Sequence, residues 1–198
     1  MRRKHWLVSL VLTGVALAAV PLAQASLIQL HVSLSGLNEV PPTASAGTGA
    51  ASLVLDTTAQ TLAGHIDFSG LTGTTTAAHI HCCLPAPFQS GVNVGVATLV
   101  PAFPGFPLGV SSGTDDFTLD LTQSSSYNPA FVTNQGGLAN AEAAFIAGLT
   151  SGRTYLNIHT NVVPSGEIRG FVVPEPLTMG LFAIGLAAAG FASRRRLG

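Results

Sequence analysis

The chain has 198 residues and a formal net charge of −1, and hydrophobic residues make up 47% of it. This near-neutral charge hides an uneven distribution, because most basic residues gather at the two ends. Residues 26–173 contain eight acidic side chains, no lysine and only two basic side chains, Arg153 and Arg169, which gives a net charge of −6. Binding to phosphate requires clustered lysine and arginine. The central region is therefore not expected to bind nucleic acid or anionic lipid.

The N-terminal residues have the three parts of a secretory signal peptide. Basic residues at positions 2–4 precede an apolar run from Trp6 to Val20, and Ala23-Gln24-Ala25 forms a small-residue cleavage site. We therefore expect residues 1–25 to direct export and to be removed after Ala25. An uncleaved anchor helix is the alternative.

Three half-buried strands are predicted at the start of the exported region. Apolar and polar residues alternate over Leu27–Leu34, and Ala50–Leu55 and Thr61–Ser69 follow after turn-rich segments. In the third strand, His65 lies on the polar side and is expected to face solvent.

A His-x-His motif follows, formed by His79 and His81. Side chains alternate along a strand, so these two imidazoles share one face. The later segment Tyr155–Thr160 repeats the pattern and places His159 opposite its apolar residues. If the two strands are neighbours, the three histidines converge. Neutral imidazoles suit copper and zinc, so this face is a candidate metal site, and the candidate additional ligands are His65, Cys82 and Cys83.

Cys82 and Cys83 are the only cysteines and are adjacent in sequence. Thiols of exported proteins tend to form disulfides. Three alternatives stay open: structural cysteines that are inert or bridged to each other, a bridge between two molecules, and metal ligands beside the histidines.

The remaining pattern predicts more short strands and one helix. Residues 82–113 are rich in proline and glycine around a short apolar strand at Val94–Val100, and this segment is expected to cover the histidine face. Strands are also expected at Asp116–Thr122, Thr154–Thr160 and Glu167–Val172, and the apolar spacing over Leu138–Leu149 predicts a helix. Short strands separated by turns indicate an all-β sandwich or barrel in residues 26–173.

The C-terminal residues 174–198 combine Pro174-Glu175-Pro176, an apolar run and an arginine cluster. This order of parts resembles the PEP-CTERM sorting signal of Gram-negative bacteria. The resemblance implies that an exosortase-type membrane protease recognises the motif and removes the helix, which leaves the protein in the cell envelope or outside the cell. Before processing, the apolar run is expected to anchor the protein in the membrane, with the arginines inside. A plain single-pass anchor is the alternative.

Three segments of the exported region resemble the CHRD domain, named after chordin. They are Leu34–Pro42, Thr76–His81, and Tyr155–Thr160 with Pro164–Gly170. The resemblance implies an extracellular immunoglobulin-like or superoxide-dismutase-like antiparallel β-sandwich without established catalytic activity. Cys82-Cys83 depart from the glycine-rich turn that is more usual after the His-x-His motif.

Structural roles compete with the metal hypothesis. The histidines are alternatively expected to bond loop backbone or acidic neighbours such as Glu167, and Glu167 and Arg169 are expected to form an ion pair or a carboxylate tether to a histidine. Asn38 and Glu39 are expected to shape or pin a turn, and Asn157 shares the face of His159. The sequence lacks a Ser-His-Asp order and a phosphate-binding loop.

Together these features lead us to expect a non-enzymatic module of the envelope or extracellular matrix that binds a polysaccharide or an envelope protein. The alternative is a copper- or zinc-binding or redox domain.

Overall fold

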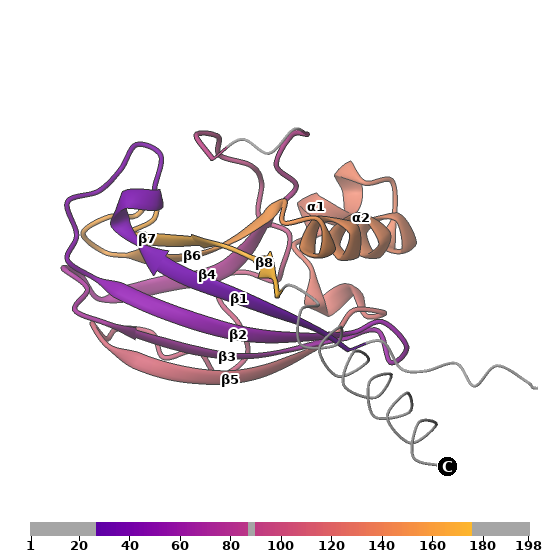
Figure 1. The fold of residues 1–198 in the computed structure, drawn as a ribbon, viewed down its shortest axis with the longest axis horizontal. Helices are drawn as coiled ribbons and strands as arrows, with labels where there is room; N and C mark the ends of the chain where they lie inside the picture. The colour runs from indigo at the N-terminus through magenta and orange to yellow at the C-terminus, as the bar shows by residue number, and fades with distance from the viewer. Residues whose placement is uncertain (1–26, 87–89, 176–198) are drawn as a thin grey trace, which may run out of the picture.

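The computed structural model describes residues 27–86 and 90–175 (Figure 1). The predicted signal peptide and the predicted apolar C-terminal helix lie outside these residues. None of the helices in the described part is long and apolar enough to cross a membrane. The strands are β1 (Leu27–Ser35), β2 (Thr48–Asp56), β3 (Thr61–Ser69), β4 (Thr75–Cys82), β5 (Gly113–Asp120), β6 (Thr154–Thr160), β7 (Ile168–Phe171) and β8 (Val173–Pro174). The helices are α1 (Pro129–Asn134) and α2 (Leu138–Thr150), and the short 3-10 helices are η1 (Gly36–Asn38) and η2 (Ser124–Ser126).

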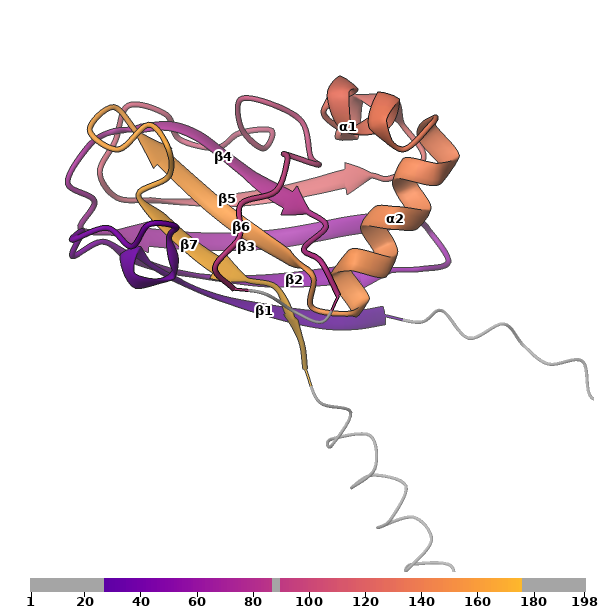
Figure 2. The same cartoon turned by 90° about the horizontal axis from the view of Figure 1, so that it is seen from above.

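The strands form one antiparallel sheet in the order β4-β6-β7-β1-β2-β3-β5, and β8 pairs with β1. The sheet curls into a half-barrel, so that β4, β6 and β7 lie over the other strands (Figures 1 and 2). β1 pairs with β2 along its whole length but with β7 only where Ser35 meets Arg169. The expected all-β antiparallel class is confirmed. The expected sandwich of two separate sheets differs from the structure, because β1 bonds to strands of both halves.

The alternating sequence pattern explains which side of each strand is buried. In β1, Leu30, Val32 and Leu34 are buried while the residues between them are exposed or partly exposed, and β2 and β3 follow the same rule. These side chains meet Ile80, Leu156 and other apolar residues of the opposite half. Fully burying one such aliphatic side chain contributes about 1.5–3 kcal/mol. The core therefore fills the space inside the curl.

The strands β4, β6 and β7 are buried on both faces, unlike β1, β2 and β3. In β6 the polar residues Asn157 and Thr154 are as buried as the apolar Leu156 and Ile158. The long segment between β4 and β5 accounts for part of this cover, because it bonds to β4 through Ala78, Cys82 and Ile80. The expected cover over the histidine face is thus present.

Two local expectations from the sequence were incomplete. The helix expected at Leu138–Leu149 is confirmed as α2, but α1 was not expected, although Asn128 caps it and Pro129 opens it as typical start signals. The strand expected at Val94–Val100 does not form a ladder. Only isolated bridges occur there, from Val96 to His81 and from Thr98 to Tyr127.

Candidate functional site

The three histidines of the candidate metal site lie on two neighbouring strands. β4 pairs with β6 in antiparallel register, with Ala77 opposite His159 and His79 opposite Asn157. His79 and His81 are almost completely buried, at 6% and 8% exposure, and His159 is half-buried. The structure therefore brings the three expected residues together from positions that are about eighty residues apart.

Each histidine directs one ring nitrogen at a backbone carbonyl. The Nδ1 atom lies 3.2 Å from Pro101 O in His79, 2.7 Å from Val94 O in His81 and 2.9 Å from Pro164 O in His159. A carbonyl oxygen can only accept a hydrogen bond, so each Nδ1 must carry the proton. In a neutral ring the other nitrogen, Nε2, then has a free lone pair.

The three rings are neutral at physiological pH because burial disfavours the charged form. Burial lowers the pKa of His79 to about 4 and that of His81 to about 3, with a smaller contribution from the charge of the neighbouring histidines. Burial also lowers the pKa of His159, against the hydrogen bond to Pro164. The site therefore presents three unprotonated Nε2 atoms.

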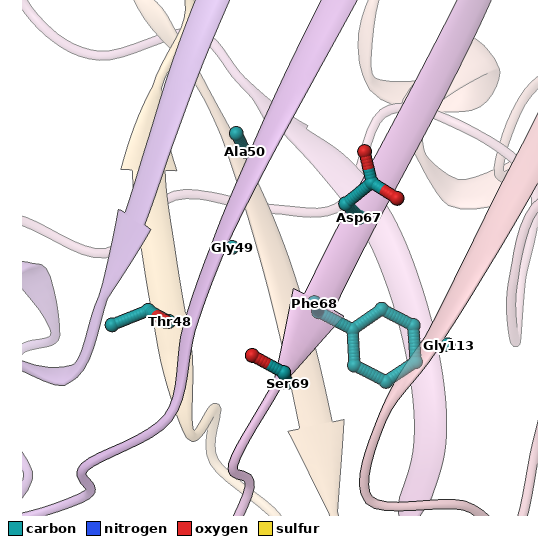
Figure 3. Close-up of a pocket in the computed structure, with 7 residues that line it drawn as sticks. All are labelled: Thr48, Gly49, Ala50, Asp67, Phe68, Ser69 and Gly113. Atoms are coloured by element: carbon teal, nitrogen blue, oxygen red, sulfur yellow. The ribbon is translucent and has the colours of Figure 1, made fainter.

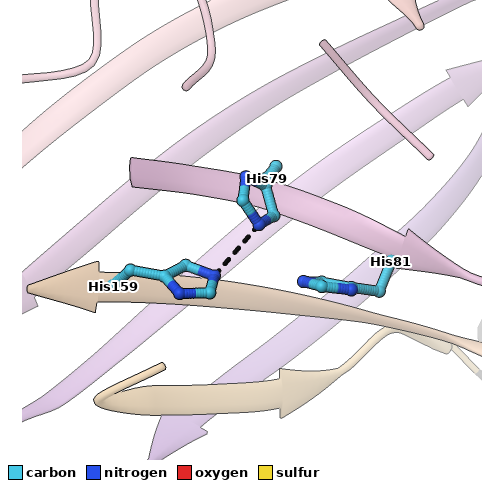
Figure 4. Close-up of side chains that lie close together, drawn as sticks. All are labelled: His79, His81 and His159. Carbon is cyan, nitrogen blue, oxygen red and sulfur yellow. Dashed lines mark hydrogen bonds between the residues drawn. The ribbon is translucent and has the colours of Figure 1, made fainter. Parts of the chain in front are cut away.

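These Nε2 atoms point toward one space (Figure 4). His79 Nε2 lies 3.0 Å from His159 Nε2, and His81 Nε2 is buried without a hydrogen-bond partner among the described residues. One ligand atom from each ring can be chosen so that all three lie within 4.8 Å of one another. The contact between His79 and His159, dashed in Figure 4, is a hydrogen bond only if one of the two Nε2 atoms carries a proton. With both Nδ1–H groups bonded to carbonyls, that requires an added proton, and a cation could take its place.

The 3.0 Å separation of His79 Nε2 and His159 Nε2 is close to that of two ligands of a small transition-metal ion, whereas the wider 4.8 Å limit for the whole set means that the rings would have to close around the ion. Nitrogen ligands lie about 2.0–2.1 Å from zinc in a tetrahedral site, which places two of them about 3.3 Å apart. The Nδ1–H groups held by carbonyls are the outer contacts that usually orient metal-binding histidines. Three neutral imidazoles fit zinc or copper better than magnesium or calcium, which prefer oxygen.

His65 does not belong to this cluster, although it was a candidate additional ligand. It lies on β3 with its ring 2.7 Å from Asp116 and 2.9 Å from Asp67, and its side chain is 46% exposed. The hydrogen bond to Asp116 is the main cause that raises its pKa. The structure thus places His65 where the sequence suggested, on a solvated strand face.

Cys82 and Cys83 form a disulfide with each other, so neither is a free thiol. Their sulfur atoms lie against the carbonyl of Ala144 in α2, on the side of β4 opposite to His81. The structure agrees with the alternative in which the two cysteines bridge each other, and in that state neither sulfur is free to bridge two molecules or to bind a metal as a thiolate. Side-chain alternation along β4 explains why Cys82 points into the core.

Glu167 does not contact a histidine or Arg169, contrary to expectation. Its carboxylate accepts hydrogen bonds from the hydroxyls of Ser45 and Thr160 and from the backbone of Thr72 and Gly73. Burial alone would raise its pKa, but these bonds outweigh burial and lower it. With four donors, the carboxylate has no lone pair left for a histidine.

Arg169 is fully buried and bonds mainly to loop oxygens. Its guanidinium donates to Asn38 O at 2.7 Å and to Asn93 Oδ1 at 2.9 Å, and its nearest carboxylate is Glu39, 4.0 Å away. Asn38 in turn donates to Arg169 O, which confirms the expected loop-pinning role. Burial raises the pKa of Glu39 to about 7, against the opposing effects of Arg169 and Asn157.

The hollow shown in Figure 3 is separate from the histidines. It has a volume of about 340 Å³ and is lined by residues of β2, β3 and β5, among which Asp67 is the single ionisable side chain. Without a second charged group, it offers no acid–base pair and no ligand set.

Sequence reasoning missed the groups that orient the histidines. Two of the three carbonyls, those of Val94 and Pro101, come from the segment between β4 and β5, and any residue type can supply a carbonyl. The side chain of Tyr155 also belongs to this outer set, and its place on the same strand face as His159 was the available signal.

The fold and the site define a small antiparallel β domain with three converging histidines, two buried and one half-buried, followed directly by a short sorting motif. A model of the CHRD domain matches residues 30–172, and a model of the PEP-CTERM protein-sorting motif matches residues 172–196. The chain therefore belongs to the CHRD domain family and carries a PEP-CTERM motif. That motif implies sorting to the cell surface by an exosortase. No curated protein and no solved structure matches the chain.

Proposed function

We propose that this CHRD protein is a surface-sorted metal-binding module, in which His79, His81 and His159 hold one copper or zinc ion. The observation that carries the proposal is the convergence of three imidazole rings whose Nδ1 atoms all bond to carbonyls, so that their Nε2 atoms are left for a ligand. A purely structural role would be served by the Nδ1 contacts alone. It gives no reason for two unprotonated nitrogens to face each other at 3.0 Å.

The proposal extends to export and partners. The sorting motif supports delivery by an exosortase-type protease acting at Pro174-Glu175-Pro176, and the acidic composition of residues 26–173 disfavours nucleic acid as a partner. We expect the processed domain to act without catalysis, bound to an extracellular polysaccharide or an envelope protein. Metal binding would then stabilise the face that the covering loops share with β4 and β6.

The test compares metal content between histidine variants. The protein is expressed from its full sequence, isolated after export without a histidine tag, and analysed by inductively coupled plasma mass spectrometry after loading with zinc or copper. We expect stoichiometric metal in the wild type and none in the His79→Ala/His81→Ala double variant, because one imidazole cannot retain the ion. His65→Ala is the matched control and should retain full metal content. Equal metal in all three proteins would reject the site.

A further inference from the structure

His81 contacts a side chain outside the histidine cluster, that of Tyr155, as well as a backbone carbonyl. The ring of Tyr155 stacks on the His81 imidazole, with centroids 4.5 Å apart and planes inclined by 11°. The two residues lie directly opposite each other across the β4–β6 ladder. Such an aromatic contact restricts the tilt of the imidazole ring.

The Tyr155 hydroxyl also fixes the carbonyl that orients His81. Val94 N–H donates to the hydroxyl oxygen at 3.2 Å, and the hydroxyl donates to Val94 O at 3.3 Å. The same Val94 oxygen accepts the His81 Nδ1–H bond at 2.7 Å. One tyrosine therefore contacts the face of the imidazole and holds its hydrogen-bond acceptor in place.

Tyr155 itself is held from its other side. The Arg169 guanidinium lies 4.4 Å from the ring centroid, and Arg169 comes from β7 whereas His81 comes from β4. The guanidinium is fully buried and fixed by bonds to Asn38 O and Asn93 Oδ1. Tyr155 is only 1% exposed. The tyrosine ring thus has little freedom to move. Because it stacks on the imidazole of His81, that imidazole also has little freedom to tilt.

We propose that Tyr155 is a positioning residue for the metal ligand His81, which aims His81 Nε2 at the space between His79 and His159. This inference rests on the proposed metal function. It assigns to Tyr155 a role through His81 and not a bond to the ion. Removing an outer contact of a metal-binding histidine typically weakens metal binding by 10- to 100-fold.

The test is Tyr155→Phe, which keeps the stacked ring and removes only the hydroxyl. Tyr127→Phe is the matched control, because the Tyr127 hydroxyl is buried and donates to a backbone carbonyl, that of Leu121, away from the histidines. Zinc affinity is measured by competition with a chromophoric chelator, and the visible spectrum of the cobalt-loaded protein reports ligand geometry. We expect Tyr155→Phe to weaken zinc binding by about 10-fold or more and to change the cobalt spectrum. Tyr127→Phe should match the wild type in both.

Wild-type affinity and spectrum in Tyr155→Phe would overturn the positioning role while leaving the metal site intact. A wild type that binds no metal would instead remove the proposed function. If Tyr155→Phe fails to fold, nitrogen NMR of the wild-type imidazoles in the metal-free protein decides. The proposal requires His81 to carry its proton on Nδ1, and a proton on Nε2 would contradict it.

Discussion

At the scale of single residues, burial decides which groups carry charge. Burial keeps the three histidines uncharged at physiological pH. It also raises the pKa of Glu39, beside the buried Arg169, to about 7. Oε1 of Glu39 has no hydrogen-bond partner among the described residues, which is costly for a charged carboxylate. The burial of Glu39 therefore favours its protonated form at mildly acidic pH.

This environment predicts that the stability of the fold depends on pH through the ionisation of Glu39. Its pKa is raised from 4.5 to about 7 in the folded state, so the folded protein binds a proton that the unfolded chain lacks between these values. The resulting stability is fully present below pH 4.5 and is lost as pH rises through 7. Glu39→Gln should remove this pH-dependent contribution, which is on the order of 3 kcal/mol.

The measurement is the free energy of urea unfolding at pH 4.5, 6 and 8 for the metal-free wild type and for Glu39→Gln. As pH rises, the free energy of unfolding of the wild type should fall relative to that of Glu39→Gln. A difference that stays constant across this range would show that Glu39 titrates normally.

At the scale of elements, Glu167 ties together three loops at one end of the sheet. Its four hydrogen bonds join the segment after η1, the turn between β3 and β4, and the end of β6. The preceding residue, Gly166, has φ +124°, a backbone conformation that favours glycine. A side chain there would also be crowded, because an added Cβ would lie 2.8 Å from Glu39 Oε1. This end of the molecule also contains Pro164, whose carbonyl orients His159.

Glu167→Gln should destabilise the fold by about 2–4 kcal/mol, because an amide leaves part of a set of buried donors without an acceptor. Denaturant unfolding measures the change, and Glu142→Gln serves as control, since Glu142 contacts a single side chain, Gln60, in the hydrogen bonds described. Equal stability of the two variants would mean that the Glu167 network contributes little.

The disulfide at the end of β4 gives a second prediction at this scale. Cys82 and Cys83 lie against α2 whereas His79 and His81 bond to carbonyls of the segment between β4 and β5, so we expect that neither sulfur is a ligand. A Cys82→Ala/Cys83→Ala variant should bind zinc with wild-type affinity while it loses some thermal stability. A large drop in affinity at unchanged folding would assign the sulfur atoms to the site after all.

At the scale of the whole molecule, the sequence predicted the elements better than their assembly. Alternation located β1, β2, β3, β4 and β6 within about two residues, because one face of each strand packs on the core. It could not show that β1 bonds to both halves of the sheet, since strand order depends on long-range pairing. Convergence of His79 and His159 was expected only on the condition that β4 and β6 are neighbours.

The outer contacts of the site were less predictable than its ligands. The orienting carbonyls of Val94, Pro101 and Pro164 leave no mark in the side-chain pattern. The partners of Glu167 and Arg169 also differed from expectation, because both side chains form hydrogen bonds with loop residues that are distant in sequence. The His-x-His motif was thus enough to predict the candidate ligands. The loop carbonyls that orient those ligands could be found only in the structure.

The central claim is that three imidazoles of one domain bind one metal ion. X-ray absorption spectroscopy of the zinc- or copper-loaded exported protein tests it most directly. We predict about three imidazole nitrogens at roughly 2.0 Å from the metal and no sulfur at about 2.3 Å. A protein that retains no metal, or a spectrum dominated by sulfur or by oxygen without imidazole scattering, would contradict the account.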